Sequence, residues 1–90
     1  MLIMVIETFH NKNARAVYER VRENGRMLPE GLEYLDSWVE NNLSRCFQLM
    51  RCDDMSLLDA WMEQWQDLVS FEVVPVITSN QAYQEVFAGQ

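Results

Sequence analysis

Two cysteines are the first residues in this 90-residue chain whose chemistry must be considered, and both lie in the segment SRCFQLMRCDD. Cys46 and Cys52 are six residues apart, which corresponds to about 20 Å in an extended strand. A disulfide requires Cα atoms within ~7 Å of each other, so this strand cannot hold a disulfide between the two.

Metal binding is not favoured by the sequence either. A structural zinc site needs cysteines about two to four residues apart, together with further nitrogen or sulfur ligands. The single histidine, His10, lies at the end of another predicted strand, so we expect no metal and no cofactor. Cys46 is a candidate nucleophile activated by His10, but a buried thiol that packs as a small apolar residue is the more common case.

Two carboxylates are candidates for acid–base chemistry. Glu7 ends an apolar strand, where burial would raise its pKa and make it a general base. The alternative is that Glu7 lies in solvent at the strand end. Asp36, in the segment LEYLDSWVE, is the second candidate base and lies close to Trp38. Arg26 and Glu30, in the preceding loop, either line the rim of a pocket or are simply solvated.

Hydrophobic periodicity predicts the elements that position these residues. Short apolar runs indicate strands, and apolar side chains at i, i+3, i+4 and i+7 indicate helices. Asn13 and Asp54 are expected N-caps, and Gly25 is expected just beyond a helix end. The expected order is strand, helix, strand, strand, helix, strand and short C-terminal helix, over residues 1–9, 13–25, 32–40, 43–52, 54–69, 71–78 and 80–87.

This order predicts an α+β fold, with a single ferredoxin-like βαββαβ domain over residues 1–90. Two split β-α-β units with right-handed crossovers give an antiparallel sheet with the strand order 4-1-3-2. The apolar run MLIMVI suits a central first strand that is buried on both faces. Pro75 lacks a backbone N–H, which suits a fourth strand at the sheet edge.

The sheet face that the helices leave open is expected to be apolar. Leu2, Met4 and Ile6 lie on one side of the first strand, and Ile3 and Val5 lie on the other. A large exposed apolar patch is unusual in a monomer, so we expect a homodimer that joins two sheets face to face as a dimeric α/β barrel. The alternative is that the C-terminal helix, which is expected to dock on the domain, folds over this face.

The loop between the second and third strands decides which side chains share a face. A two-residue Asn-Asn turn would set Trp38 beside Arg45, away from Cys46. A three-residue loop would set Trp38 beside Cys46 and Asp36 beside Gln48, and we adopt this register because it leaves a more apolar face for the helices. The open face then carries five candidate ligand-binding residues: Tyr34, Asp36, Trp38, Cys46 and Gln48. For Asp36 and Gln48, hydrogen bonds across a dimer are the alternative role.

Charge and hydropathy exclude several classes of partner. Fourteen acidic and seven basic residues give a net charge of −7, which opposes binding to nucleic acid or to an anionic membrane surface. No segment approaches the ~18 consecutive apolar residues of a transmembrane helix. The start of the chain lacks the basic residues of a signal peptide. We therefore expect a cytoplasmic protein with reduced thiols.

Three segments, GRMLPEGLEYLDSWV, RCFQLM and WQDLVSFEVVPV, occur in this order along the chain. In them the chain resembles, over residues 1–79, a small family of uncharacterised bacterial proteins assigned to the dimeric α/β-barrel group. The resemblance implies a ferredoxin-like subunit and a sheet-to-sheet dimer, and it implies no catalytic residues. The wider group includes monooxygenases, isomerases and ligand-sensing regulators, so the fold leaves the function open.

The sequence therefore favours a small homodimer that binds a small apolar or aromatic molecule. The competing class is a cofactor-free monooxygenase or isomerase that uses Glu7 or Asp36 as its base. A third class is a structural or protein-interaction subunit without a pocket. An enclosed cavity that contains Trp38 and a carboxylate would separate the first two classes from the third.

Overall fold

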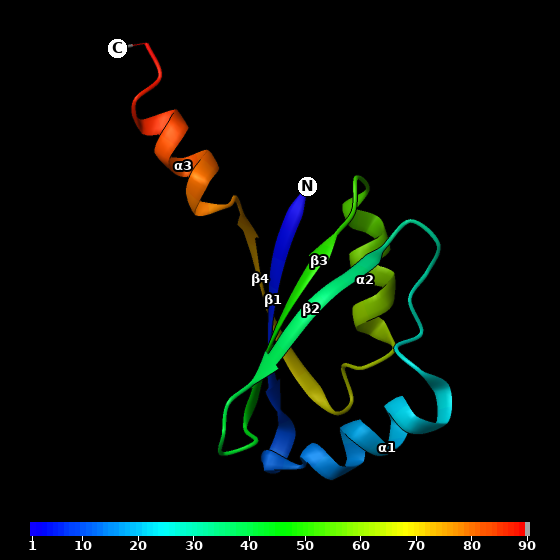
Figure 1. Ribbon diagram of the computed structural model, residues 1–90. Coiled ribbons are helices and arrows are strands. Elements are labelled where there is room, and N and C mark those ends of the chain that lie inside the picture. The colour runs from blue at the N-terminus through cyan, green and yellow to red at the C-terminus, as the bar shows by residue number, and fades with distance from the viewer. Residues whose placement is uncertain (90) are drawn as a thin grey trace.

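The structure is a computed structural model that describes residues 1–89 (Figure 1). Its elements follow the predicted βαββαβ order and end in a short C-terminal helix. In chain order they are β1 (Leu2–Phe9), a 3-10 helix (His10–Lys12), α1 (Ala14–Asn24), β2 (Glu33–Val39), β3 (Arg45–Arg51), α2 (Met55–Glu63), β4 (Val69–Val76) and α3 (Ser79–Val86).

The four strands form an antiparallel sheet in the order β2-β3-β1-β4. This is the predicted ferredoxin-like order, read from the other edge of the sheet. β1 is central and pairs with β3 on one side and with β4 on the other. β4 is an edge strand, and its Pro75 lies opposite Ile3, where the lost backbone N–H is tolerated.

The main helices begin where their capping residues predict. The Asn13 side chain accepts a hydrogen bond from the backbone N–H of Ala16, at 3.1 Å. Gly25 follows α1 with a φ of +68°, a conformation that glycine adopts without the strain of a side chain. Asp54 caps α2 by accepting hydrogen bonds from both the backbone and the hydroxyl of Ser56.

α2 is shorter than the expected helix over residues 54–69, because it ends at Glu63. The backbone N–H groups of Gln64 and Trp65 bond to carbonyls three residues earlier, which tightens the chain into turns. The turns allow β4 to begin at Val69, and Trp65 remains buried although it lies outside the helix.

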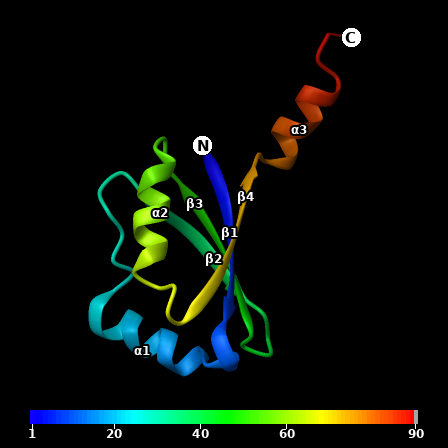
Figure 2. The same cartoon turned by 180° about the vertical axis from the view of Figure 1, so that it is seen from behind.

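The two main helices, α1 and α2, lie on the same side of the sheet, which we call the helix face. We call the opposite side the open face. α2 runs alongside the strands, whereas α1 lies across one end of the sheet (Figures 1 and 2). Ile3 and Val5 of β1 are fully buried on the helix face. The core continues into the helices through Val17 of α1 and Leu58 of α2.

The expected docking of the C-terminal helix is wrong in this structure, because α3 extends away from the sheet beyond the end of β4 (Figure 1). Tyr83 is 67% exposed and Val86 is 71% exposed. Only two residues, Ile77 and Thr78, separate β4 from α3. The helix is capped by Thr78 through a reciprocal capping box with Gln81.

The loop between β2 and β3 is longer than either register that the sequence suggested. Trp38 pairs with Phe47 and Val39 with Cys46, so residues 41–44 form a four-residue loop beyond the pair of Glu40 and Arg45. Within the loop, Leu43 has a φ of +62°, in the left-handed region. The predicted pairing of Trp38 with Cys46 is therefore wrong.

A β-bulge in β2 divides the expected ligand-binding residues between the two faces. The register shifts between Tyr34 and Asp36, which leaves Leu35 as the additional residue. Tyr34 lies opposite Met50 on the helix face, whereas Asp36 lies opposite Leu49 on the open face. The expectation that all five residues share the open face is wrong.

None of the helices among residues 1–89 has the length and apolar character needed to cross a membrane.

Candidate functional site

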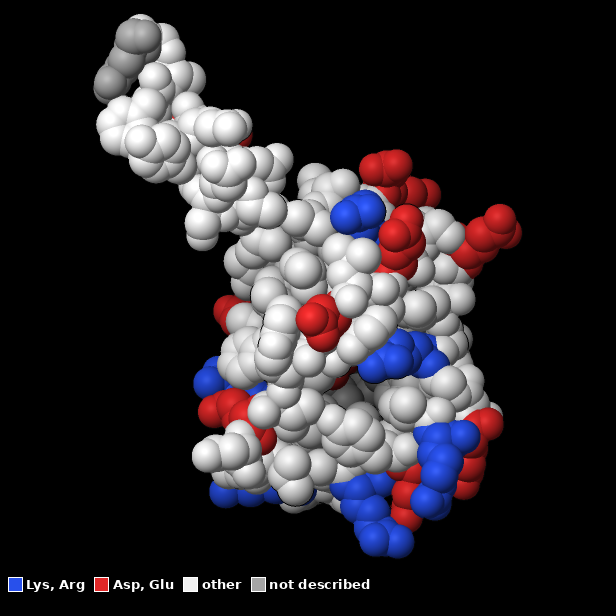
Figure 3. Space-filling view, in the orientation of Figure 1, with Lys and Arg blue, Asp and Glu red and all other residues white. Residues whose placement is uncertain are grey.

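A pocket lies between the helix face of the sheet and the helices, with lining residues from both. Its cavity volume is about 60 Å³. A hollow opens near the centre of the molecular face in Figure 3, next to basic side-chain atoms. Seven apolar or aromatic side chains line the pocket: Phe9, Val17, Tyr18, Val21, Trp61, Trp65 and Val69. Five polar side chains complete the lining: Glu7, Arg26, Ser37, Cys46 and Gln48.

Glu7 supplies a buried carboxyl group to this pocket. Odd-numbered residues of β1 face the helices, so Glu7 continues the buried row of Ile3 and Val5. Burial raises the pKa of Glu7 from its ordinary 4.5 to about 7, against the opposing effects of a hydrogen bond from Cys46 and of the Arg26 charge. A carboxyl with this pKa exchanges protons readily at neutral pH, so Glu7 is suited to acid–base chemistry.

Cys46 lies directly opposite Glu7, one strand away. Burial, followed by the nearby Glu7 charge and the hydrogen bond to Glu7, raises the pKa of the Cys46 thiol to about 12. Because the thiolate is the nucleophilic form, this thiol is a poor nucleophile at neutral pH. Its position fits a small packing residue that donates a hydrogen bond to the carboxyl.

The structure does not place His10 beside Cys46. The Nδ1 atom of His10 lies 3.1 Å from the carbonyl oxygen of Asp67, and Nε2 lies 2.8 Å from the Ser70 hydroxyl. His10 is thus held beside the start of β4 and does not line the pocket. Within residues 1–89, no three histidine, cysteine or acidic side chains cluster as metal ligands would, and both cysteines are free thiols.

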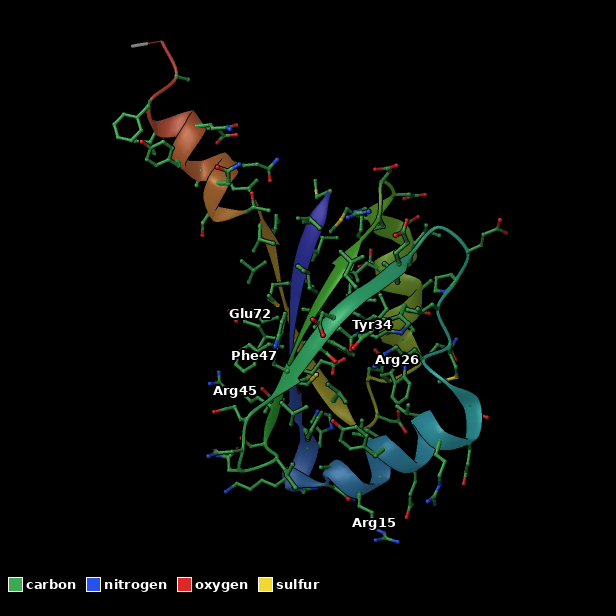
Figure 4. All side chains as sticks on the ribbon, in the orientation of Figure 1. Arg15, Arg26, Tyr34, Arg45, Phe47 and Glu72 are labelled. Carbon is green, nitrogen blue, oxygen red and sulfur yellow. The ribbon has the colours of Figure 1, made fainter. Side chains whose placement is uncertain are left out.

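Arg26 lies at the pocket on the loop between α1 and β2, and its backbone is held in place by two tryptophans. The indole N–H groups of Trp61 and Trp65 donate to the Arg26 carbonyl oxygen at 2.9 and 3.2 Å. The next residue, Met27, has a φ of +58°. The Arg26 guanidinium stacks over the Tyr34 ring, 3.6 Å from the ring centroid (Figure 4).

The structure brings some of the five expected ligand-binding residues together and separates the others. Cys46 and Gln48 line the pocket, although on the helix face and not on the open face as expected. Tyr34 supports Arg26, and its hydroxyl lies 2.6 Å from the Ser37 hydroxyl. Asp36 and Trp38 lie on the opposite side of the sheet, outside the pocket.

The two separated residues have local roles in this structure. The Asp36 carboxylate accepts a hydrogen bond from the backbone N–H of Ser37 at 2.8 Å, and it is exposed. Trp38 is 53% exposed on the open face. An Asp36 base beside Trp38 is therefore not part of this pocket, whereas a Glu7 base remains a prediction.

Several pocket residues were not among the site candidates that the sequence suggested. Trp61 and Trp65 belong to the helical stripe that indicates a core, and they also form the pocket wall. Tyr18 of α1 lines the pocket while about half of its surface is exposed. The alternation of β1 was the available signal, because it places Glu7 and Phe9 on the same face as Ile3.

The chain belongs to the family described as a domain of unknown function (DUF3303), whose profile matches residues 1–89. This agrees with the resemblance to a small uncharacterised family. No curated protein matches the chain significantly. The family description assigns no ligand, reaction or partner.

Proposed function

We propose that this protein is a cytoplasmic homodimer that binds a small apolar or aromatic molecule in the pocket between the sheet and its helices. The observation that carries the proposal is the pocket itself, in which a mostly aromatic and aliphatic wall surrounds a few polar groups. This combination is characteristic of small-molecule sites. Two free buried thiols are in keeping with a reducing compartment.

The size of the pocket supports a ligand of about one ring. A cavity of about 60 Å³ is well below the ~300 Å³ at which sites for drug-sized ligands begin. Aromatic pairs stabilise each other beyond their buried area, by roughly 1 kcal/mol. Phe9, Trp61 and Trp65 therefore favour a planar ligand over an aliphatic one of the same volume.

The open face and α3 support the homodimer. Trp38 on β2 and Val74 on β4 are exposed on the open face, and α3 turns away from it instead of covering it. α3 itself has eight residues, and helices shorter than ~12 residues are marginal in water without tertiary packing. A second copy of the chain satisfies both features, since the same apolar surface is present on each subunit.

The exposed apolar area also approaches what a dimer needs. Six large apolar residues of the open face and the C-terminal segment are between 37% and 71% exposed: Trp38, Val74, Ile77, Tyr83, Val86 and Phe87. A half-exposed aromatic side chain contributes on the order of 100 Å². The six then supply roughly 500 Å² of the ~800 Å² that each partner buries in a standard interface.

Protein-observed NMR with a library of single-ring compounds tests the binding proposal. Val21→Phe, which places a ring in the pocket, is expected to abolish binding of any compound that the wild type binds. Val74→Phe places the same ring on the open face and is the matched control. If no compound binds, or if Val21→Phe binds as well as the control, the pocket is not a ligand site. Sedimentation velocity at micromolar concentration tests the dimer, and a monomer would contradict it.

A second candidate function follows from Glu7. A buried carboxyl whose pKa is about 7 can accept a proton from a bound carbon acid and return it at another carbon, as isomerases do. Incubation with a small β,γ-unsaturated ketone in D₂O would then show deuterium incorporation and double-bond migration. Both must disappear in Glu7→Gln and persist in Asp36→Asn, whose carboxyl lies outside the pocket.

A further inference from the structure

We propose that the pocket takes a small aromatic anion, and that the Arg26 guanidinium binds the charged group of that anion. This inference rests on the proposed small-molecule function, because it names the chemical class of the ligand. It goes beyond that function by assigning recognition to one residue and to one sign of charge, in a chain whose net charge is −7.

Arg26 differs from most arginines of the chain in its lack of a partner charge. Arg15, Arg20, Arg45 and Arg51 each pair with a carboxylate. Arg26 has no carboxylate within ion-pair distance among residues 1–89, although it lines the pocket together with Glu7. A partly buried cation without a partner is stabilised when an anion binds to it.

The way in which Arg26 is held leaves its hydrogen-bond donors available. Its guanidinium lies over the face of the Tyr34 ring at 3.6 Å from the centroid, and stacking uses only the face of the planar group. The five N–H donors lie in the plane and point outward from its edge. A carboxylate can therefore accept two parallel hydrogen bonds while the stacking persists.

The support of Arg26 is rigid before any ligand arrives. Two indole N–H groups bind its carbonyl oxygen, and the Tyr34 hydroxyl is itself close to the Ser37 hydroxyl. Little side-chain and loop entropy is then lost on binding, which favours affinity. Trp61 and Trp65 both fix Arg26 and form the aromatic wall, so charge recognition and ring recognition are linked in one structure.

Glu7 makes the binding of an anion dependent on protonation. An anion in the pocket adds a like charge near the Glu7 carboxylate, so it prefers the neutral carboxyl. The other titratable groups near Glu7 are Cys46 from β3, Tyr18 from α1 and Arg26 from the loop. The remaining lining residues, which include those from α2, β4 and the chain between them, carry no charge.

Isothermal titration with benzoate and with benzamide, a neutral molecule of nearly the same shape, tests the inference. At pH 6 benzoate is expected to bind at least about tenfold more tightly than benzamide. Arg26→Gln should remove this difference, and it keeps the backbone carbonyl that the indoles bind. Arg26→Lys should retain part of the difference, since it keeps the charge but loses the fork. Arg22→Gln makes the same change of charge on α1 outside the pocket and should leave both affinities unchanged.

The outcomes separate this inference from the function on which it rests. If benzamide or other neutral rings bind as tightly as benzoate, the anion assignment is overturned while small-molecule binding stands. If benzoate keeps its preference in Arg26→Gln, recognition by Arg26 is overturned. If no single-ring compound binds at all, the proposed function fails, and this inference fails with it.

Discussion

The Glu7 carboxyl on β1 and the Cys46 thiol on β3 lie opposite each other across one strand pair, and both line the same pocket. Burial raises the pKa of each group, to about 7 for Glu7 and to about 12 for Cys46. At neutral pH the thiol therefore stays protonated as a donor, while the carboxyl changes its protonation state. The carboxyl is the reactive member of the pair.

The stability of the protein should fall as the pH rises from 4.5 to about 7. Across this range the unfolded chain releases the Glu7 proton that the folded protein retains, so the contribution of neutral Glu7 is full below pH 4.5 and is lost by about pH 7. The loss is on the order of 3 kcal/mol. Urea denaturation of wild type and Glu7→Gln at equal protein concentration measures it. Between pH 4.5 and 8, the free energy of unfolding of Glu7→Gln should rise by this amount relative to that of wild type. If the two free energies change with pH in the same way, the burial of Glu7 is contradicted.

Cys46 should resist alkylation in the folded protein. With its pKa raised to about 12, the thiolate fraction at pH 8 is roughly 10³-fold smaller than for an ordinary cysteine. In a Cys52→Ser variant, mass spectrometry should detect almost no reaction with iodoacetamide until urea unfolds the chain. Rapid modification of the native protein would show that Cys46 is accessible and ionised.

Trp61 and Trp65 should be coupled through the Arg26 carbonyl. Each Trp→Phe change leaves the other indole as a donor to that oxygen, but the double change leaves the oxygen without either donor. We expect the double variant to lose about 1 kcal/mol more than the sum of the single losses in free energy of unfolding. A double-mutant cycle by urea denaturation measures this coupling, and strict additivity would contradict the shared hydrogen bond.

Affinity for an aromatic anion should weaken as the pH rises through 7. Benzoate favours the neutral form of Glu7, so ionisation of Glu7 lowers its affinity, by up to about tenfold for each further pH unit. Titration calorimetry between pH 6 and 8 should show this loss in wild type and a flat profile in Glu7→Gln. The same profile in both proteins would show that Glu7 is not the group responsible.

Trp38→Glu should dissociate the proposed dimer without unfolding the subunit. A charge at this half-exposed position opposes burial between two sheets, and we expect the dimer dissociation constant to rise at least about tenfold. Trp38→Phe keeps an apolar ring and is the control. Sedimentation equilibrium measures the constants. An unchanged dimer in Trp38→Glu would place the interface elsewhere.

The elements and their order could be predicted because their signals are local. The caps at Asn13 and Asp54 indicate where α1 and α2 begin, and the glycine at position 25 indicates where α1 ends. The apolar run of β1 and Pro75 of β4 each indicate one place in the sheet, and the two places agree with one topology.

The register of the β2–β3 hairpin could not be predicted, because it depends on the length of the loop and on a bulge in β2. Asn-Asn chemistry suits a two-residue turn, yet the chain makes a four-residue loop in which Leu43 adopts a left-handed φ of +62°. The bulge at Leu35 then moves Tyr34 to the other face. Likewise, the amphipathic pattern of α3 indicates an apolar stripe but does not say what will cover it.

The bulge in β2 determines which side chains of the strand lie on each face of the sheet. Before the bulge, Tyr34 lies on the helix face, where the pocket is. After the bulge, Trp38 lies on the open face. Substitutions at these positions alter the two surfaces separately. If Leu35 were kept but paired regularly, so that the bulge was lost, Tyr34 would lie on the same face as Asp36, and the platform beneath Arg26 would be removed. The pairing of β2 with β3, and not only the composition of β2, therefore determines which side chains support the pocket.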